Sequence, residues 1–343
     1  VFSVVTYEKG KDLVVVGEVD QQEAKSELLE KLKELYPSVI DSVTVLPAKE
    51  LGEKIWAIVN VSVANMRSEP AESAELGSQV LMGNVVRVLK KKGGWAYIQS
   101  PDKYLGWVDT DQIVVVNERT VEDWNGISAV FVTGMNGTIY EGMTTSSMPV
   151  SDVTAGAVLK RIGGTEEWTV VALADSRRGY IRTDMLIEKR HWGTVLVPIP
   201  DTVVKTGKLL KGVPYLWGGT SPKGVDCSGF TRTVYLLNGV LLNRDANQQA
   251  EQGQPVEPGK DFENLKKGDL LFFGRAAGNG KPERIVHVGI YIGNKRYIHS
   301  SGMVRINSFD EAEKDFNKYN LERFVRARRI ITSTPHVTEM KVQ

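Results

Sequence analysis

The sequence predicts an α+β protein with more than one domain, and three observations support that prediction. The chain has 343 residues, which is more than one hydrophobic core usually holds. Its middle part consists of short alternating segments broken by glycine, a pattern typical of small β-barrels. Its last part has a group of helical segments followed by a run of strands, which is typical of an α+β domain.

Residues 1–54 are expected to form an N-terminal extension of strand and helix. The stretch from Val4 to Val19 is strand-like. The segment DQQEAKSELLEKLKELYP that follows is predicted to be a helix ended by Pro37. Its apolar positions recur at helical spacing and are Leu28, Leu29, Leu32 and Leu35.

The middle region repeats itself without a gap. The segment GNVVRVLKKKGGWAYIQSPDKYLGWVDTDQI aligns with GAVLKRIGGTEEWTVVALADSRRGYIRTDML. A constant offset through glycines and aromatic residues indicates two copies of one small barrel, at residues 55–118 and 119–190. The aligned pairs include Gly83 with Gly156, Trp95 with Trp168, Gly106 with Gly179 and Trp107 with Tyr180.

Residues 191–343 form the predicted α+β domain. Pro198 and Pro200 suit a linker or an entry strand, and residues 202–211 are predicted to be a short helix. The elements expected after the cysteine segment are strands in GDLLFFG, IVHVGIYIG and KRYIHSSG, a charged helix near Asp310 to Lys318, and a last strand in RFVRARRII.

Composition and charge exclude several classes of protein. Apolar residues make up 41% of the chain and charged residues 25%, as in ordinary soluble globular proteins. Lys and Arg (43) balance Asp and Glu (42), giving a formal net charge of +1. A dedicated binder of nucleic acid or anionic membranes needs a basic excess on one face, so we expect no nucleic-acid partner. No apolar stretch approaches the roughly 18 residues that span a bilayer, and we expect a monomer without a membrane span.

The first ten residues, VFSVVTYEKG, bear on the compartment. They lack a charged n-region and a cleavage site, so the sequence predicts no signal peptide. They also lack a starting Met, which is compatible with the mature form of an exported protein or with a trimmed chain. A single cysteine permits no internal disulfide and leaves the compartment open.

Cys227, in GVDCSGF, is the first candidate for catalysis. A thiol is a good nucleophile only as a thiolate, and the unpaired N–H groups at a helix start favour that form. Asp226 is a suitable cap for a helix beginning near Cys227, because the apolar residues of FTRTVYLLNG recur at helical spacing. Beside a cationic His, the thiol pKa of about 8.5 falls to roughly 3.5–7.5. The alternative is a buried cysteine used only for packing.

Two histidines on neighbouring predicted strands complete a catalytic group. His287 lies in RIVHVGIYIG, and His299 lies in RYIHSSG after a turn at Gly293–Asn294. Antiparallel pairing around that turn brings the two imidazoles close together. With the single cysteine they indicate a nucleophile, a base and an orienting residue. A zinc hydrolase with the same three residues as ligands is an alternative, although the chain has no H-E-x-x-H motif.

Four blocks in the last region resemble the NlpC-type family of cell-wall cysteine peptidases, in type and in order. They are PYLWGGTSPKGVDCSGF, GDLLFFG, HVGIYIG and YIHSSG. The resemblance covers roughly residues 200–330 and implies a papain-like core. It implies Cys227 as nucleophile, His287 as base and His299 as the third polar residue, with Tyr215 beside the oxyanion site. The middle region likewise resembles the bacterial SH3-like barrels of cell-wall proteins.

The whole layout resembles a narrower group, the γ-D-glutamyl-L-diamino-acid endopeptidases, also described as dipeptidyl-peptidase VI. This group carries two SH3-like barrels ahead of the peptidase and cuts murein peptides that begin with free L-Ala-γ-D-Glu. Selectivity for a free amine requires buried anions or acceptors and a wall that blocks a longer chain. The substrate-binding residues that the resemblance implies are Glu69, Tyr104, Trp217, Asp226, Ser228 and Asp245.

Several of these residues also have a purely structural interpretation. Glu69 is then a solvated turn residue, Tyr104 a barrel-surface aromatic, Asp226 only a helix cap and Trp217 only a core residue. Asp245 is followed by Ala246, where the group has a small hydroxyl residue. One hydrogen bond to the D-Glu carboxylate is therefore expected to be missing.

We therefore expect a cysteine peptidase that needs no cofactor and has a murein-derived peptide as its substrate. The expected reaction is hydrolysis of the γ-D-glutamyl to diamino acid bond in peptides with a free N-terminal L-Ala. A broad murein endopeptidase acting on wall-attached stem peptides and a non-catalytic cell-wall binding protein are the alternatives. The expected compartment is the cell envelope or periplasm, with a cytoplasmic recycling role as the alternative.

Overall fold

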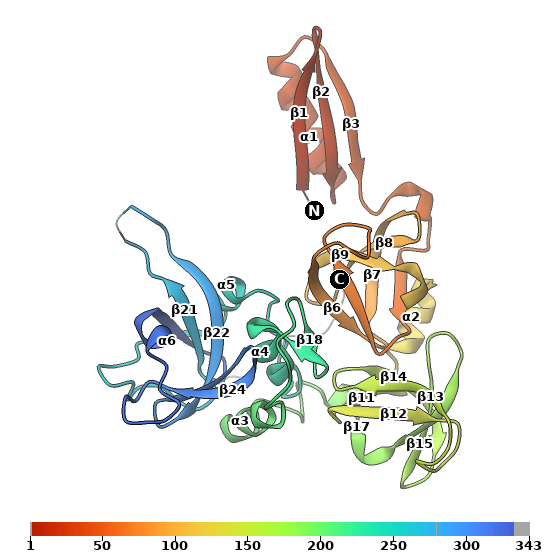
Figure 1. The fold of residues 1–343 in the computed structure, drawn as a ribbon. Helices are drawn as coiled ribbons and strands as arrows, with labels where there is room; N and C mark the ends of the chain where they lie inside the picture. The colour runs from red at the N-terminus through yellow and green to blue at the C-terminus, as the bar shows by residue number, and fades with distance from the viewer. Residues whose placement is uncertain (1, 279, 333–343) are drawn as a thin grey trace.

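The computed structural model describes residues 2–278 and 280–332 (Figure 1). The strands of this part of the chain form sheets of three, seven, seven and six strands in chain order, and one further two-stranded sheet. The helices are few and most are short. The predicted α+β class is confirmed.

The N-terminal extension projects away from the rest of the molecule (Figure 1). Its elements are β1 (Phe2–Lys9), β2 (Asp12–Val19), α1 (Gln22–Leu35) and β3 (Val39–Val45). Strand β2 is antiparallel to β1 and parallel to β3, and leucines of α1 pack against the buried side of the sheet. The strand-like stretch from Val4 to Val19 belongs to a hairpin, because Gly10 adopts a φ of 67° and turns the chain back.

The two middle sheets share one topology, which confirms the internal repeat. The first sheet contains β4 (Trp56–Val59), β5 (Val63–Arg67), β6 (Leu76–Leu81), β7 (Val85–Lys92), β8 (Trp95–Gln99), β9 (Leu105–Asp109) and β10 (Ile113–Val116). The second contains β11 (Ala129–Val132), β12 (Asn136–Tyr140), β13 (Pro149–Thr154), β14 (Val158–Gly164), β15 (Trp168–Ala172), β16 (Arg178–Arg182) and β17 (Leu186–Glu188).

The strand order is β10-β4-β7-β8-β9-β5-β6 in the first sheet and β17-β11-β14-β15-β16-β12-β13 in the second, read in the same sense. Each strand thus has its counterpart seven strands later. The aligned Gly83 and Gly156 both have positive φ, 74° and 91°, at the same turn. Helix α2 (Glu118–Trp124) joins the two sheets, which we call the first and the second barrel.

The last domain contains a six-stranded sheet of order β20-β25-β21-β22-β23-β24. Its elements are α3 (Pro200–Leu209), β18 (Thr220–Ser221), β19 (Gly224–Val225), α4 (Cys227–Leu236), α5 (Ala246–Gln249), β20 (Gln254–Val256), β21 (Leu270–Arg275), β22 (Arg284–Gly293), β23 (Arg296–Ser301), β24 (Met303–Ser308), α6 (Lys318–Glu322) and β25 (Phe324–Arg329). Helix α4 packs on β22 and β23, and Phe230 and Val234 share a hydrophobic cluster with Val288 and Ile298. This packing brings the start of α4 to the strands that carry both histidines.

The charged helix expected near Asp310 to Lys318 is wrong. The residues before Lys318 form turns, and α6 begins only there. The backbone carbonyl of Asp315 accepts hydrogen bonds from the Ser308 N–H and from the Asn307 side chain, both over 2.9 Å. These hydrogen bonds attach the segment to β24. The Asp315 carbonyl therefore pairs with residues of that strand and not with an N–H group of a helix.

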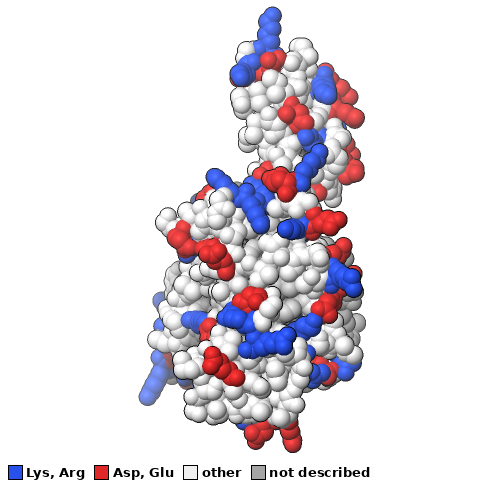
Figure 2. Space-filling view, turned by 90° about the vertical axis from the view of Figure 1, so that its right-hand side faces the viewer, with Lys and Arg blue, Asp and Glu red and all other residues white. Residues whose placement is uncertain are grey.

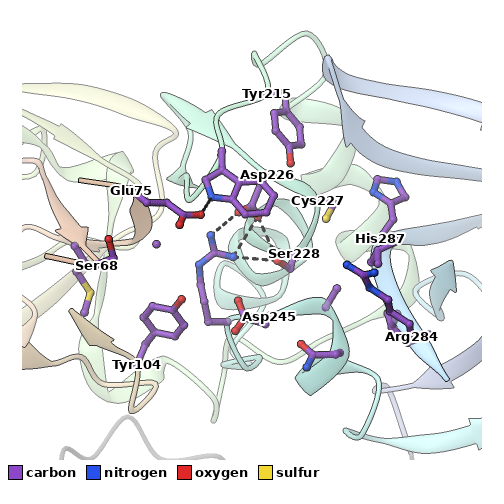
Figure 3. A pocket seen from close by; sticks show the side chains of 18 of the residues that line it. Ser68, Glu75, Tyr104, Tyr215, Asp226, Cys227, Ser228, Asp245, Arg284 and His287 are labelled. Atoms are coloured by element: carbon purple, nitrogen blue, oxygen red, sulfur yellow. Dashed lines mark hydrogen bonds and ion pairs between the residues drawn. The ribbon is translucent and has the colours of Figure 1, made fainter. Parts of the chain in front are cut away.

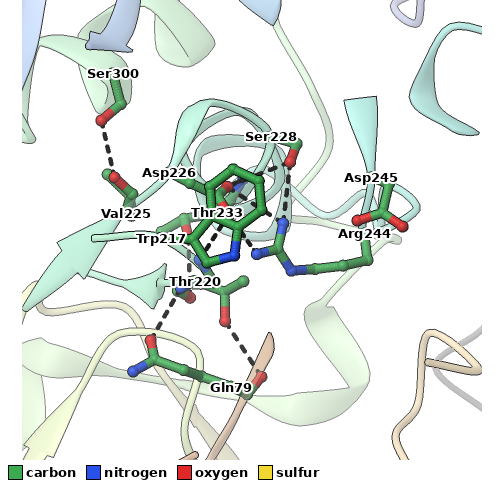
Figure 4. Close-up of polar contacts among 12 residues, drawn as sticks. Gln79, Trp217, Thr220, Val225, Asp226, Ser228, Thr233, Arg244, Asp245 and Ser300 are labelled. Carbon is green, nitrogen blue, oxygen red and sulfur yellow. Dashed lines mark hydrogen bonds and ion pairs between the residues drawn. The ribbon is translucent and has the colours of Figure 1, made fainter. Parts of the chain in front are cut away.

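The first barrel packs directly against the last domain. Gly218 lies so close to β6 that a Cβ atom there would be 2.3 Å from the Leu76 carbonyl oxygen. Thr220 donates its N–H to Gln79 Oε1 over 2.9 Å and its hydroxyl to the Gln79 backbone carbonyl over 3.2 Å (Figure 4). Arg232 and Asp102 form a buried ion pair at 2.9 Å across the same interface. Separating the two units would leave a buried charge without its partner, so these contacts stabilise one arrangement of the two units.

The surface carries charges of both signs. On the face shown in Figure 2, Lys and Arg side chains are interspersed with Asp and Glu. No helix within residues 2–278 and 280–332 has the length and apolar character needed to cross a bilayer. The domain limits 1–54, 55–118, 119–190 and 191–343 stay predictions, and residues 333–343 lie outside the described part.

Candidate active site

A cavity of about 720 Å³ lies between the first barrel and the last domain. Figure 3 shows Glu75 and Tyr104 on the barrel side, His287 and Arg284 on the opposite side, and Cys227 between the two sides. This volume falls in the range of small-ligand sites, roughly 300–1,000 Å³. Because both units contribute walls, neither unit contains the complete cavity by itself.

Cys227 is the first residue of α4 and lines this cavity. The Asp226 carboxylate caps the helix, as predicted, by accepting the Gly229 N–H over 2.6 Å. Cys227 is 9% exposed, and Figure 3 places its sulfur on the side of His287. Packing alone does not require a thiol at a helix start on a cavity wall.

The two histidines are neighbours, as strand pairing predicts. His287 on β22 and His299 on β23 have Nε2 and Nδ1, respectively, 2.7 Å apart. His287 lines the cavity, whereas His299 lies behind it and is 1% exposed. Cys227 and His287 both line the cavity and His299 lies behind His287, an arrangement that suits a nucleophile, a base and an orienting residue.

Burial governs the protonation of this group. It raises the pKa of Cys227 to about 11, with the Asp226 charge acting in the same direction and backbone hydrogen bonds from Val288 and Ser228 opposing the shift. Burial also lowers the pKa of His287 well below its usual range, and that of His299 to about 4. The condition for a thiol pKa of roughly 3.5–7.5, an adjacent cationic His, is therefore not met at neutral pH. At neutral pH the pair is a thiol and a neutral imidazole, so the base takes the proton during attack.

Alkylation of Cys227 by iodoacetamide is expected to accelerate up to and beyond pH 9. The reagent reacts with the thiolate, and a thiol with a pKa of about 11 gains thiolate about tenfold per pH unit below that value. Because Cys227 is the only cysteine, mass spectrometry of the whole protein measures this rate directly. N-acetylcysteine is the reference thiol and is expected to react faster at pH 7. A rate that levels off below pH 7 would instead demonstrate a thiolate–imidazolium pair.

Asp226 and Ser228 belong to a buried polar network around Arg244. The Asp226 carboxylate pairs with Arg244 at 2.5 Å and also accepts the Gly218 N–H over 3.0 Å (Figure 4). Arg244 donates to the Ser228 hydroxyl over 3.0 Å as well. Asp226 is therefore more than a helix cap, but its charge is already balanced. The network shapes the cavity floor rather than offering a free anion.

Three of the predicted aromatic residues line the cavity. Burial and the neighbouring Cys227 raise the pKa of Tyr215 to about 12, so its hydroxyl remains a donor at neutral pH. Trp217 is 61% exposed and donates its indole N–H to Glu75 Oε1 over 2.7 Å, which excludes the interpretation as a core residue. Tyr104 is half-buried, and Gly77 makes room for it, because a Cβ there would lie 3.3 Å from its hydroxyl.

The barrel acid on the cavity wall is Glu75, and the predicted Glu69 is not among the lining residues. Glu69 is exposed and is absent from the lining, which agrees with its interpretation as a solvated turn residue. A tight turn follows it, closed by the Ala71 N–H bonding to the Glu69 carbonyl over 2.8 Å. The chain returns to the cavity at Glu75, whose carbonyl accepts the Ser68 N–H over 2.9 Å.

Asp245, as the resemblance implies, lines the cavity, and it caps the short helix α5. Burial raises the pKa of its carboxyl group, while the neighbouring Arg244 opposes that shift. Ala246 also lines the cavity and offers no hydroxyl there. Asp245 and Glu75 are thus two carboxylates on the same cavity.

Five charged lining residues escaped the sequence analysis: Arg67, Glu75, Arg244, Glu283 and Arg284. Arg67 and Glu283 form ion pairs with Glu72 and Arg326. Arg244 had one signal, its position beside Asp245 in NRDANQQA. Glu75 and Arg284 had none, because an acid in a barrel loop and a cation at the start of a strand are ordinary surface features. Within the described residues Arg284 forms no ion pair, so its charge is available to the cavity.

The alternative of a shared zinc ion gains no support from this geometry. His287 and His299 direct ring nitrogens at each other rather than at a common point. In the described part of the chain, no group of three or more His, Cys, Asp or Glu side chains is arranged to hold a metal ion.

Comparisons with known proteins match both walls of the cavity. The NlpC/P60 family profile matches residues 212–329, and the profile of the bacterial dipeptidyl-peptidase SH3 domain matches residues 66–113. Dipeptidyl-peptidase 6 of Lysinibacillus sphaericus is 30% identical over 264 residues, which cover 74% of this chain and 92% of that protein. The γ-D-glutamyl-L-lysine dipeptidyl-peptidase of Bacillus cereus is 32% identical over 260 residues, covering 73% and 71%.

The fold is also similar to a solved one. A crystal structure of an NlpC/P60 family protein from Bacillus cereus matches with a TM-score of 0.70 and 26% identity, over 81% of this chain and 100% of that one. Every residue that lines the cavity lies within one of the two ranges that the family profiles match. The expected papain-like peptidase with SH3-like domains is confirmed, and the chain belongs to the NlpC/P60 family of cysteine peptidases.

Proposed function

We propose that this peptidase hydrolyses the γ-D-glutamyl to diamino acid bond of murein peptides with a free N-terminal L-Ala and releases L-Ala-γ-D-Glu. The observation that carries the proposal is the barrel wall, with Glu75 and Tyr104, which lines one side of the cavity that contains Cys227. Two relatives named as dipeptidyl-peptidases, one of them for γ-D-glutamyl-L-lysine, support the same substrate class.

In the proposed reaction the Cys227 sulfur attacks the γ-carbonyl carbon of D-Glu while His287 takes the thiol proton. In this proposal the Tyr215 hydroxyl, which lines the same cavity, and backbone N–H groups near Cys227 donate to the resulting oxyanion. His287 then gives its proton to the amine of the diamino acid, which leaves, and a thioester remains. Water, deprotonated by His287, hydrolyses the thioester and restores the thiol.

The charges along the cavity support a substrate with an ammonium at one end and a carboxylate at the other. The carboxylates of Glu75 and Asp245 lie on the barrel side of Cys227, and the Arg284 guanidinium lies on the His287 side (Figure 3). A free L-Ala amine meets the two acids in this orientation. The carboxylate of the leaving diamino acid then meets Arg284.

The same arrangement weighs against the alternatives. A broad endopeptidase on wall-attached stem peptides needs an open groove beyond L-Ala, where the first barrel stands here. A non-catalytic wall-binding protein has no need for a cysteine and a histidine facing one cavity. We keep the cell envelope as the expected compartment and a monomer as the expected oligomeric state.

The direct test is product analysis. The enzyme incubated with L-Ala-γ-D-Glu-L-Lys-D-Ala is expected to release L-Ala-γ-D-Glu and L-Lys-D-Ala, identified by mass spectrometry. Cys227→Ser protein, prepared in parallel, controls for contaminating peptidases. Release of free L-Ala or D-Ala would place the cleaved bond elsewhere and overturn the proposal.

A further inference from the structure

Behind the two histidines lies a third side chain, Asn307 on β24. Its Oδ1 is 2.8 Å from Nε2 of His299, whose Nδ1 in turn lies 2.7 Å from Nε2 of His287. The three side chains form one row that runs inward from the cavity. Each neutral imidazole carries a single N–H, so the group at the inner end decides which nitrogens carry protons.

The orientation of the Asn307 amide is fixed by backbone groups. Its Nδ2 donates to the Asp315 carbonyl over 2.9 Å, and a carbonyl cannot donate in return. Its Oδ1 also faces Nδ2 of Asn317, at 3.4 Å, and the Oδ1 of Asn317 accepts the Asn320 N–H over 3.0 Å. An amide turned the other way would place a donor against a donor on one side and two acceptors together on the other. Asn307 therefore presents its oxygen to His299.

The proton positions follow from that oxygen. Asn307 Oδ1 can only accept, so Nε2 of His299 carries the proton and Nδ1 of His299 is an acceptor. Nε2 of His287 must then donate to it, which leaves Nδ1 of His287 without a proton. Nδ1 is the ring nitrogen of His287 that makes no hydrogen bond to His299, and it carries a free lone pair. His287 lines the same cavity as Cys227.

We infer that Asn307 is a positioning residue: it holds both histidines in the tautomer that leaves Nδ1 of His287 free to take the Cys227 proton. The inference rests on the roles of Cys227 and His287 in the proposed function. The opposite tautomers would put a proton on Nδ1 of His287, where it blocks proton transfer, and would set Nε2 of His299 against Asn307 Oδ1 as two acceptors without a proton. Asn307 disfavours that state.

The test uses two substitutions that separate positioning from structure. Asn307→Leu removes both the oxygen toward His299 and the donor toward Asp315. Asn307→Asp keeps an oxygen toward His299 but loses the donor toward Asp315 and adds a negative charge, which also favours a proton on Nε2 of His299. If Asn307 acts through the histidines, kcat falls about ten- to a hundredfold in the leucine variant with KM little changed, while the aspartate variant stays within a few fold of the original enzyme.

The tautomers of His287 and His299 can be measured without any substrate. In protein labelled with 15N-histidine, NMR at neutral pH distinguishes protonated from unprotonated ring nitrogens, and the chain has only four histidines. The original protein and the aspartate variant are expected to show His287 protonated at Nε2, and the leucine variant is expected to show a mixture. A proton on Nδ1 of His287 in the original protein overturns the inference. So does a folded leucine variant with unchanged tautomers. If the proposed peptide is not cleaved at all, the proposed function fails while this spectrum still decides the inference.

Discussion

Cys227→Ala is expected to abolish hydrolysis of L-Ala-γ-D-Glu-L-Lys while the protein keeps its fold. No other described cysteine can replace the nucleophile, so the rate should fall about 10⁴-fold or more. The thiol is neutral in the resting enzyme because burial raises its pKa to about 11, so its removal strands no charge. The loss of stability should then be only about 1 kcal/mol. Kinetics on the tripeptide and chemical denaturation measure the two effects separately.

The histidines provide the graded comparison for this result. His287→Ala should be nearly as damaging as the loss of the thiol, because His287 is the proposed base that takes the thiol proton and returns it to the leaving amine. His299→Ala should be milder, about a hundredfold, because His299 touches His287 and not the cavity. A folded Cys227→Ala protein with near-normal turnover would remove the nucleophile assignment. Equal effects of the two histidine substitutions would remove the distinction between base and orienting residue.

The catalytic group was predictable from the sequence because local rules determine it. The capping residue Asp226 and the apolar spacing of α4 predict a helix that begins at Cys227. A short turn between β22 and β23 brings His287 and His299 together. The internal repeat was predictable for a similar reason, since the glycines and aromatic residues of the barrels recur at one offset. Such signals lie in the order of residues along a few neighbouring elements.

The remaining features depend on contacts between distant segments. Whether Glu69 or Glu75 reaches the cavity is decided by one turn in a barrel loop and by Trp217, which lies 142 positions away from Glu75. The pKa of Cys227 depends on the burial that the whole fold imposes, and the helix-start argument alone gave the wrong direction. The contact of Asn307 with His299 could not be predicted from the sequence, because it depends on how β24 and the turns after Ser308 pack against β23.

The second large effect concerns the free amine of the substrate. The enzyme is expected to cleave N-acetyl-L-Ala-γ-D-Glu-L-Lys about a hundredfold or more slowly, in kcat/KM, than the free tripeptide. Acetylation removes the ammonium that the Glu75 and Asp245 carboxylates face and adds bulk against the wall that Tyr104 and the first barrel form. Comparable rates on the two peptides would favour a broad murein endopeptidase over the dipeptidyl-peptidase that we propose.

Glu75→Gln tests which part of this discrimination is electrostatic. The amide keeps an oxygen for the Trp217 indole, so the wall stays in place while the charge disappears. The free tripeptide should then react about tenfold more slowly, because a charge-assisted contact becomes a neutral one, while the acetylated peptide should react as before. Glu69→Gln is the matched control, because it removes the same charge from the same loop outside the cavity lining. If Glu69→Gln slows the free peptide and Glu75→Gln does not, Glu69 moves to the cavity when substrate binds, and the residue that the family resemblance implies is the one that holds the amine.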